Sequence, residues 1–133
     1  MKKHLLFGAL LLCNVAAAQT FSGGTGTKND PYLISNVNDL EELGNMTDKP
    51  GANGEQQTYG KYFRLTQDIT GPFTGMIGYE GLFKGDFEGG GHCIKLDINM
   101  PNENYVGLFG TVKSGAVHDL AVSGSVVGCN YVG

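Results

Sequence analysis

Residues 78–83 (GYEGLF) return as residues 104–109 (NYVGLF), and these two stretches decide the expected fold. Tyr79 aligns with Tyr105, and the Gly-Leu-Phe block that follows aligns without a gap. Residues 130–133 (NYVG) begin a third copy at the same interval. A fixed period of about 20 to 50 residues is typical of an architecture in which successive copies stack on one another.

Each copy consists of short apolar stretches between glycines. Residues 93–98 and 120–123 alternate, or nearly alternate, apolar with polar side chains, as half-buried strands do. Glycines in the gaps allow sharp turns between such strands. We therefore predict an all-β fold, a right-handed parallel β-solenoid (β-helix) with coils of about 26 residues. A β-sandwich meander is the alternative, since its turns also recur, but it does not require one block at a fixed interval.

The register of the repeat stays open between two alignments. A slightly shorter shift, which aligns Leu96 with Leu120 and Ile98 with Val122, matches the apolar positions as well as the shift from Tyr79 to Tyr105 does. A slip of one residue would turn the apolar face of a strand outward. The residues expected to face inward are Leu82, Phe83, Leu96, Ile98, Leu108, Phe109, Leu120 and Val122.

Residues 1–18 have the pattern of a secretory signal peptide. Two lysines precede an apolar run at residues 5–15, and three alanines precede Gln19, where we expect cleavage. The run is shorter than the roughly 20 residues of a membrane span, so no transmembrane segment is predicted. Cys13 raises the alternative of a lipoprotein, but it follows Leu12 rather than a small residue. We expect simple export, to the medium or to the cell surface in association with the outer membrane.

The charge balance excludes some classes of partner. The sequence has 9 Lys and Arg against 13 Asp and Glu, and removal of Lys2 and Lys3 leaves 7 basic residues and a net charge of −6. No basic run is present, which argues against nucleic acid and against anionic membrane surfaces. Export would permit a disulfide, but Cys93 and Cys129 fall at different places on the repeat. We therefore expect two free thiols.

The chain divides into three parts. After the signal peptide at residues 1–18, residues 19–47 form a leader and one short capping helix. Ser35 or Asn36 can cap that helix within residues 35–47, apolar residues form one stripe, and Gly44 is expected to end it. Residues 48–133 hold the repeats. Because the sequence stops inside a copy, we expect it to be a fragment of a longer protein.

These motifs resemble a known repeat family. Residues 105–110 (YVGLFG), 117–122 (VHDLAV) and 131–133 (YVG) are similar to the GLUG-motif repeats of exported bacterial surface proteins. Residues 85–94 (GDFEGGGHCI) resemble the Gly-rich turn that often precedes them, and residues 24–34 resemble the opening of many such proteins in Bacteroidota. The resemblance implies a stalk or adhesion module, since such repeats occur in adhesin-like proteins and in non-catalytic regions of immunoglobulin A proteases.

Acidic and histidine side chains give only weak candidates for chemistry. His92 and His118 share a position in the register set by Tyr79 and Tyr105 and could bind a metal if they stacked, but no third metal ligand is evident. Asp86 and Glu88 near Asp68 suggest paired carboxylates for glycoside cleavage or calcium, although acids in Gly-rich turns are more often simply solvated. We predict no catalytic residue, no metal site and no cofactor.

Tyr79, Tyr105 and Tyr131 recur at one place in the repeat and form the candidate binding site. Such a column supports the turns below it, and it also offers an aromatic strip to glycans or to host and extracellular proteins. We therefore predict a non-catalytic secreted or cell-surface module for adhesion or spacing. The alternative is the accessory N-terminal region of a larger secreted enzyme, either a protease of the immunoglobulin A type or a polysaccharide-degrading one.

Overall fold

The computed structural model describes residues 20–133, so the predicted signal peptide and Cys13 lie outside the described residues. The elements in chain order are β1 (Tyr32–Ile34), α2 (Val37–Asp48), β2 (Tyr62–Leu65), β3 (Ile69–Phe73), β4 (Asp86–Glu88), β5 (Cys93–Asn99), β6 (Ala116–His118) and β7 (Ala121–Val127). From β2 onward the chain alternates between two parallel sheets, one in the order β1-β2-β4-β6 and the other in the order β3-β5-β7.

The strands pair in parallel, as the repeat predicted, but the all-β solenoid with uniform coils is wrong. The intervals between residues that face each other across the sheets are unequal, since Phe73 faces Leu96 whereas Tyr32 faces Phe63. The structure is a mixed α/β fold of two small parallel sheets and one helix. The alignment of the copies assumed one constant spacing. In the structure the connections between strands differ in length, so each strand pairs with the next at a different interval.

The helix begins where the sequence predicted and ends later. The side chain of Asn36 accepts a hydrogen bond from the backbone N–H of Asp39 at 3.0 Å, which satisfies a free amide of the first turn. Gly44 does not end the helix, because it is buried inside it, where an added Cβ would lie 3.0 Å from the carbonyl oxygen of Met76. The helix ends at Asp48 because Lys49 precedes Pro50, a position that disfavours helical backbone.

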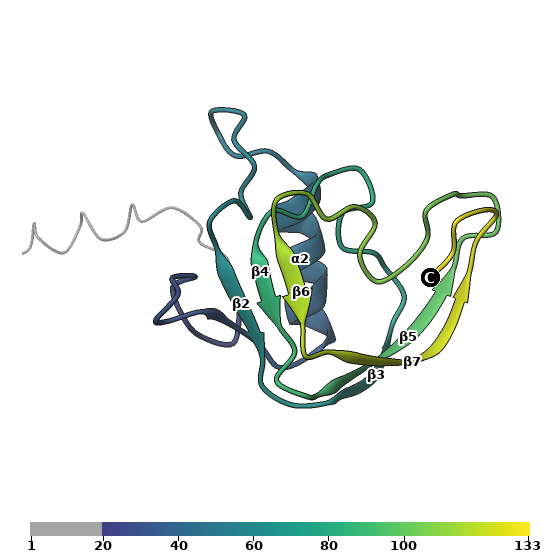
Figure 1. The fold of residues 1–133 in the computed structure, drawn as a ribbon, viewed down its shortest axis with the longest axis horizontal. Helices are drawn as coiled ribbons and strands as arrows, with labels where there is room; N and C mark the ends of the chain where they lie inside the picture. Colours follow the sequence, from purple (N-terminus) through teal and green to yellow (C-terminus); the bar gives the residue numbers. More distant parts are fainter. Residues whose placement is uncertain (1–19) are drawn as a thin grey trace, which may run out of the picture.

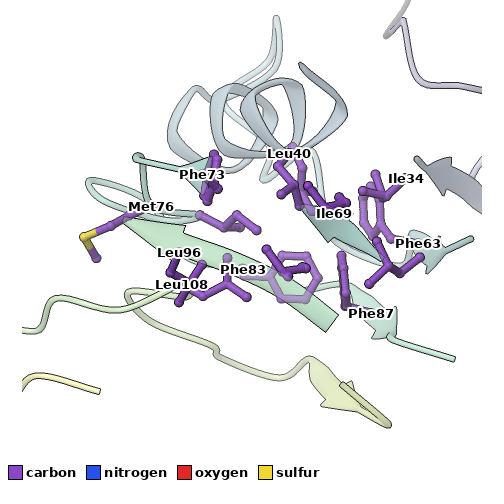
Figure 2. Packing of buried hydrophobic residues seen from close by; sticks show 14 of the residues in the cluster. Ile34, Leu40, Phe63, Ile69, Phe73, Met76, Phe83, Phe87, Leu96 and Leu108 are labelled. Atoms are coloured by element: carbon purple, nitrogen blue, oxygen red, sulfur yellow. The ribbon is translucent and has the colours of Figure 1, made fainter. Parts of the chain in front are cut away.

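Helix and sheets enclose one apolar core. Figure 2 shows Leu40 of α2 above Ile69 and Phe83, with Phe63 and Phe87 at the side of the first sheet. The phenylalanine rings lie close enough to interact, with centroids 5.8 Å apart for Phe63 and Phe83 and 5.1 Å apart for Phe83 and Phe109. Phe83 and Phe109, which occupy the same position in the two copies, therefore pack against each other.

The inward-facing set is confirmed only in part. Four of its members are buried, namely Phe83, Leu96, Ile98 and Leu108. Leu82, Phe109 and Leu120 are half-buried, and Val122 is exposed. The outlier lies in β7, which borders its sheet on the outside and has a neighbouring strand, β5, on one side only (Figure 1).

Candidate functional site

Two of the three predicted tyrosines form a stacked pair on the surface. The rings of Tyr105 and Tyr131 lie 4.7 Å apart between centroids and are inclined by 6°. Both side chains are exposed, at 61% and 72% of their full surface. Offset or stacked aromatic pairs stabilise each other beyond the area that they bury. Each ring therefore uses one face for its partner, and much of the pair stays open to solvent.

The backbone around the pair holds the two copies in register. The N–H of Tyr105 donates to the carbonyl of Asn130 at 2.9 Å, and the N–H of Gly133 donates to the carbonyl of Val106 at 2.9 Å. The side-chain amide of Asn130 donates to Oδ1 of Asn104 at 3.0 Å. The equivalent residues Asn104 and Asn130 therefore meet as the repeat predicted, in this part of the chain.

Tyr79 does not join the pair. Around it, Ile77 faces Phe109 and Phe83 faces Val112, and both intervals are longer than the one between Tyr79 and Tyr105. Because of the longer interval, Tyr79 is offset from Tyr105, the residue at the same position of the next copy. Its ring makes no aromatic contact within residues 20–133. The column of three tyrosines is thus reduced to a pair.

Tyr79 instead interacts with Glu103, a residue that the sequence did not single out. The negative charge of Glu103 is the main cause that raises the pKa of the Tyr79 phenol, followed by burial and by the hydrogen bond to the same carboxylate. Tyr79, Glu103 and Tyr105 line an open hollow of about 310 Å³. This hollow joins the isolated tyrosine to the edge of the stacked pair.

The histidines and acids form separate ion pairs rather than one site. His92 Nδ1 lies 3.4 Å from Asp68 Oδ1, and the Nε of Arg64 lies 2.6 Å from Glu88 Oε2. His92 and His118 do not face each other, because the residue opposite His118 across the sheet is Glu88. The structure therefore does not place His92 opposite His118, and it gives Asp68, Asp86 and Glu88 three different partners.

His118 lies between two carboxylates. Its Nε2 is 2.9 Å from Asp86 Oδ1 on β4, and its Nδ1 is 2.9 Å from Asp119 Oδ2. The hydrogen bonds to Asp119 and then to Asp86 raise the pKa of His118 above its ordinary value, because they favour the protonated ring. The three side chains tie β6 to β4, which gives them a structural role at the edge of the sheet.

Other features have no evident chemistry. Within residues 20–133 no group of three His, Cys, Asp or Glu residues is arranged to hold a metal ion. Both described cysteines, Cys93 and Cys129, are free thiols. No helix in the described part of the chain is long and apolar enough to cross a membrane.

Sequence reasoning missed a second group of surface residues. Lys61 and Lys84 lie far apart in the sequence, yet both line one open hollow of about 560 Å³ beside Tyr59. No motif connects the two lysines, so only the folded chain shows that they converge.

Comparisons with known proteins give distant relatives. The chain is 31% identical over 148 aligned residues to a protein of Evansella cellulosilytica named Gly-rich membrane protein, and 30% identical over 120 residues to halomucin of Haloquadratum walsbyi. These alignments cover 94% and 83% of the chain but 16% and 1% of the relatives, so it spans a small part of their length. No model of a protein family matches the chain. No solved structure matches it significantly. The chain is thus similar to short stretches of two much longer proteins.

Proposed function

We propose that this chain is a non-catalytic module of a surface protein and that its exposed tyrosine pair contributes a binding surface. The names of the two relatives, a membrane protein and a halomucin, support a surface location. The resemblance of residues 105–110 and 131–133 to GLUG-motif repeats supports the same class of protein. Glycans and extracellular proteins are the proposed partners, and the activity of any longer protein around this module remains part of the proposal.

The observation that carries the proposal is the backbone conformation of the tyrosine pair. Tyr105 and Tyr131 have φ angles of 58° and 55°, a left-handed region that is uncommon for residues other than glycine. Placing a non-glycine residue there costs about 1–2 kcal/mol. Glycine would remove that cost, so the presence of a tyrosine at both positions supports a use for the side chains, since strained backbone often accompanies function.

The stacked rings suit contacts with flat, partly apolar partners. A tyrosine offers an aromatic face and a hydroxyl group, which is why this residue is frequent at interfaces. Two parallel rings make a surface that is broader than a single side chain and that loses little conformational entropy on binding, because each ring is already held by the other. Weak contacts of this kind gain strength when several modules are linked in one protein.

A binding screen tests the proposal. The purified chain would be applied to arrays of glycans and of extracellular matrix proteins, and the affinity of any partner would be measured for the chain and for Tyr105→Ala and Tyr131→Ala. We expect each substitution to weaken binding by about 2- to 10-fold, the worth of one aromatic contact. Val127→Ala, an exposed apolar residue on β7, is the matched control and should leave the affinity unchanged.

Two outcomes would contradict the proposal. One is a partner whose affinity is unaffected by both tyrosine substitutions. The other is turnover of a protein or polysaccharide that is lost in Asp86→Asn or His118→Gln, because that would place a catalytic group in the chain. Thermal unfolding of each variant shows whether a loss of binding reflects a loss of fold.

A further inference from the structure

We propose that the hollow beside Lys61 and Lys84 binds an acidic saccharide. This site is separate from the tyrosine pair, and the inference does not depend on the proposed role of that pair. The hollow has a volume of about 560 Å³ and is open to solvent. It lies where the loop that precedes β2 meets the C-terminal part of α2, which contributes Met46.

The two lysines converge because one buried residue holds both segments. Thr58 is fully buried, and its carbonyl accepts a hydrogen bond from the N–H of Lys61 at 3.1 Å. Its hydroxyl accepts a hydrogen bond from the N–H of Lys84 at 3.0 Å. Gly85 allows this close approach, because an added Cβ would lie 2.9 Å from the carbonyl oxygen of Lys61. These hydrogen bonds fix the backbone of both lysines beside the same hollow.

The charges of this hollow favour an anion. Neither Lys61 nor Lys84 forms a salt bridge within residues 20–133, whereas Arg64, His92 and His118 each face a carboxylate. Glu55 is the one acid that lines the hollow, and its Oε2 already accepts a hydrogen bond from the N–H of Asn53 at 2.9 Å. Two unpaired ammonium groups in a chain with excess negative charge make a local site for an anionic group.

The remaining lining favours a sugar over a simple anion. Tyr59 is 69% exposed and offers a free aromatic surface against which the apolar face of a sugar ring can pack. Gln56 also lines the hollow, and its buried Oε1 has no hydrogen-bond partner in the described part of the chain. An unsatisfied acceptor is costly, and a sugar hydroxyl that reaches it after a small rotation of the amide would satisfy it.

A second hollow extends the site. It has a volume of about 400 Å³ and shares Tyr59, Lys61 and Lys84 with the first, so the two adjoin. Asp86 lines the second hollow, but its carboxylate is paired with His118. The lysines therefore lie between two open depressions, an arrangement that suits successive residues of an acidic polysaccharide chain.

Calorimetric titration of the chain tests this inference. The ligands are an oligogalacturonate, a sulfated chondroitin oligosaccharide, a neutral cello-oligosaccharide of similar length, and oligoglutamate. We expect the acidic saccharides to bind and the neutral one to bind at least about 10-fold more weakly, and we expect affinity to fall as salt rises, because exposed charges are screened. The relative affinities for galacturonate and for chondroitin sulfate identify the preferred acidic group.

Variants assign the binding to the hollow. We expect Lys61→Ala and Lys84→Ala each to lower affinity about 3- to 5-fold, and Tyr59→Ala to lower it about 3- to 10-fold. Lys95→Ala removes an exposed lysine on β5 and is the matched control. Lys84→Arg should retain affinity, which separates a loss of charge from a loss of fold, and Tyr131→Ala should leave it unchanged because the tyrosine pair is a different site.

Several results would overturn the inference. Oligoglutamate that binds as tightly as the acidic saccharides would show an unspecific anion site or a site for acidic peptides. Equal affinity for the neutral saccharide, absence of binding by either acidic saccharide, or an equal loss in Lys95→Ala would reject the lysine hollow as an acidic saccharide site.

Discussion

Strands β5 and β7 have the same length and lie side by side, yet one is buried and the other is open. They pair residue for residue along their whole length, from Cys93 opposite Ala121 to Asn99 opposite Val127. In β5 every second side chain is buried, whereas in β7 all but Val126 are exposed. Ile94 is fully buried, and Val122 directly opposite it is 54% exposed.

The difference shows that the alternation of apolar and polar residues predicts which face of a strand is apolar, but not whether that face is buried. β5 has a strand on each side, β3 and β7 (Figure 1). Its side chains Ile94, Leu96 and Ile98 belong to the buried core. β7 has β5 on one side and no further strand among residues 20–133 on the other. Edge position alone does not expose a strand, because β3 borders the same sheet on its other side, yet α2 contacts it and Ile69 and Phe73 are buried. Burial is therefore decided by whether another element covers the apolar face of the strand.

The largest expected effect comes from truncating the paired residues Ile94 and Val122. Ile94→Ala should lower the free energy of unfolding by about 2–5 kcal/mol, because it removes buried apolar surface and leaves a cavity. Val122→Ala should cost less than about 1 kcal/mol, since its side chain is already half in water. Denaturant unfolding measures both values, and equal losses would show that β7 is as well packed as β5.

Substitution of Gly124 tests the backbone of β7, the exposed strand. Gly124 has a φ angle of 100°, and an added Cβ would lie 2.0 Å from the carbonyl oxygen of Leu96 on β5. We expect Gly124→Ala to cost about 1–3 kcal/mol, the usual range for a strained backbone position, and to weaken the pairing of β7 with β5.

Gly54→Ala is the matched control for this substitution. Gly54 also has a positive φ, of 79°, but an added Cβ would meet nothing within 4 Å. It should therefore carry the conformational cost alone, about 1–2 kcal/mol, without loss of strand pairing. Amide hydrogen exchange of residues 121–127 distinguishes the two, and unchanged protection in Gly124→Ala would contradict the close approach.

A smaller effect is expected at the covered end of the fold. Helix α2 contacts β3, which lies at the end of the sheet opposite β7. Asn36 caps the N-terminus of this helix. Asn36→Ala should lower the free energy of unfolding by about 0.5–2 kcal/mol, whereas Asn36→Asp should retain most of the stability, because a carboxylate also accepts the hydrogen bond of the cap. A cost of Asn36→Asp equal to that of Asn36→Ala would show that the cap is not the reason.

The smallest expected effect is the pH dependence at the open edge. His118 on β6 has a raised pKa, so its contribution to stability is fully present below the ordinary pKa of about 6.5 and is lost as pH rises through the higher value in the folded chain. The side chain is exposed, so the change is small. Titration of the ring by NMR should give a pKa above the ordinary value, and Asp119→Asn or Asp86→Asn should lower it. A pKa unchanged by both substitutions would contradict the paired geometry.

The sequence by itself determined the local elements. Asn36 and the apolar stripe at Leu40 and Leu43 predicted the helix, and the alternation of residues 93–98 predicted β5, because these patterns depend on neighbours a few positions away. The parallel direction of the strands also followed from the repeat, and so did the pairing of Tyr105 with Tyr131, where the period of the repeat holds.

Only the tertiary structure decided how far each copy is displaced from the next. Spacings between facing residues vary with the length of each connection, and a small difference in that length moved Tyr79 away from the tyrosine pair and His118 away from His92. No local sequence pattern predicts that Lys61 and Lys84 lie together around buried Thr58. Contacts between distant segments depend on loop geometry and on the packing of the whole core, and neither is encoded in the periodicity of a short stretch.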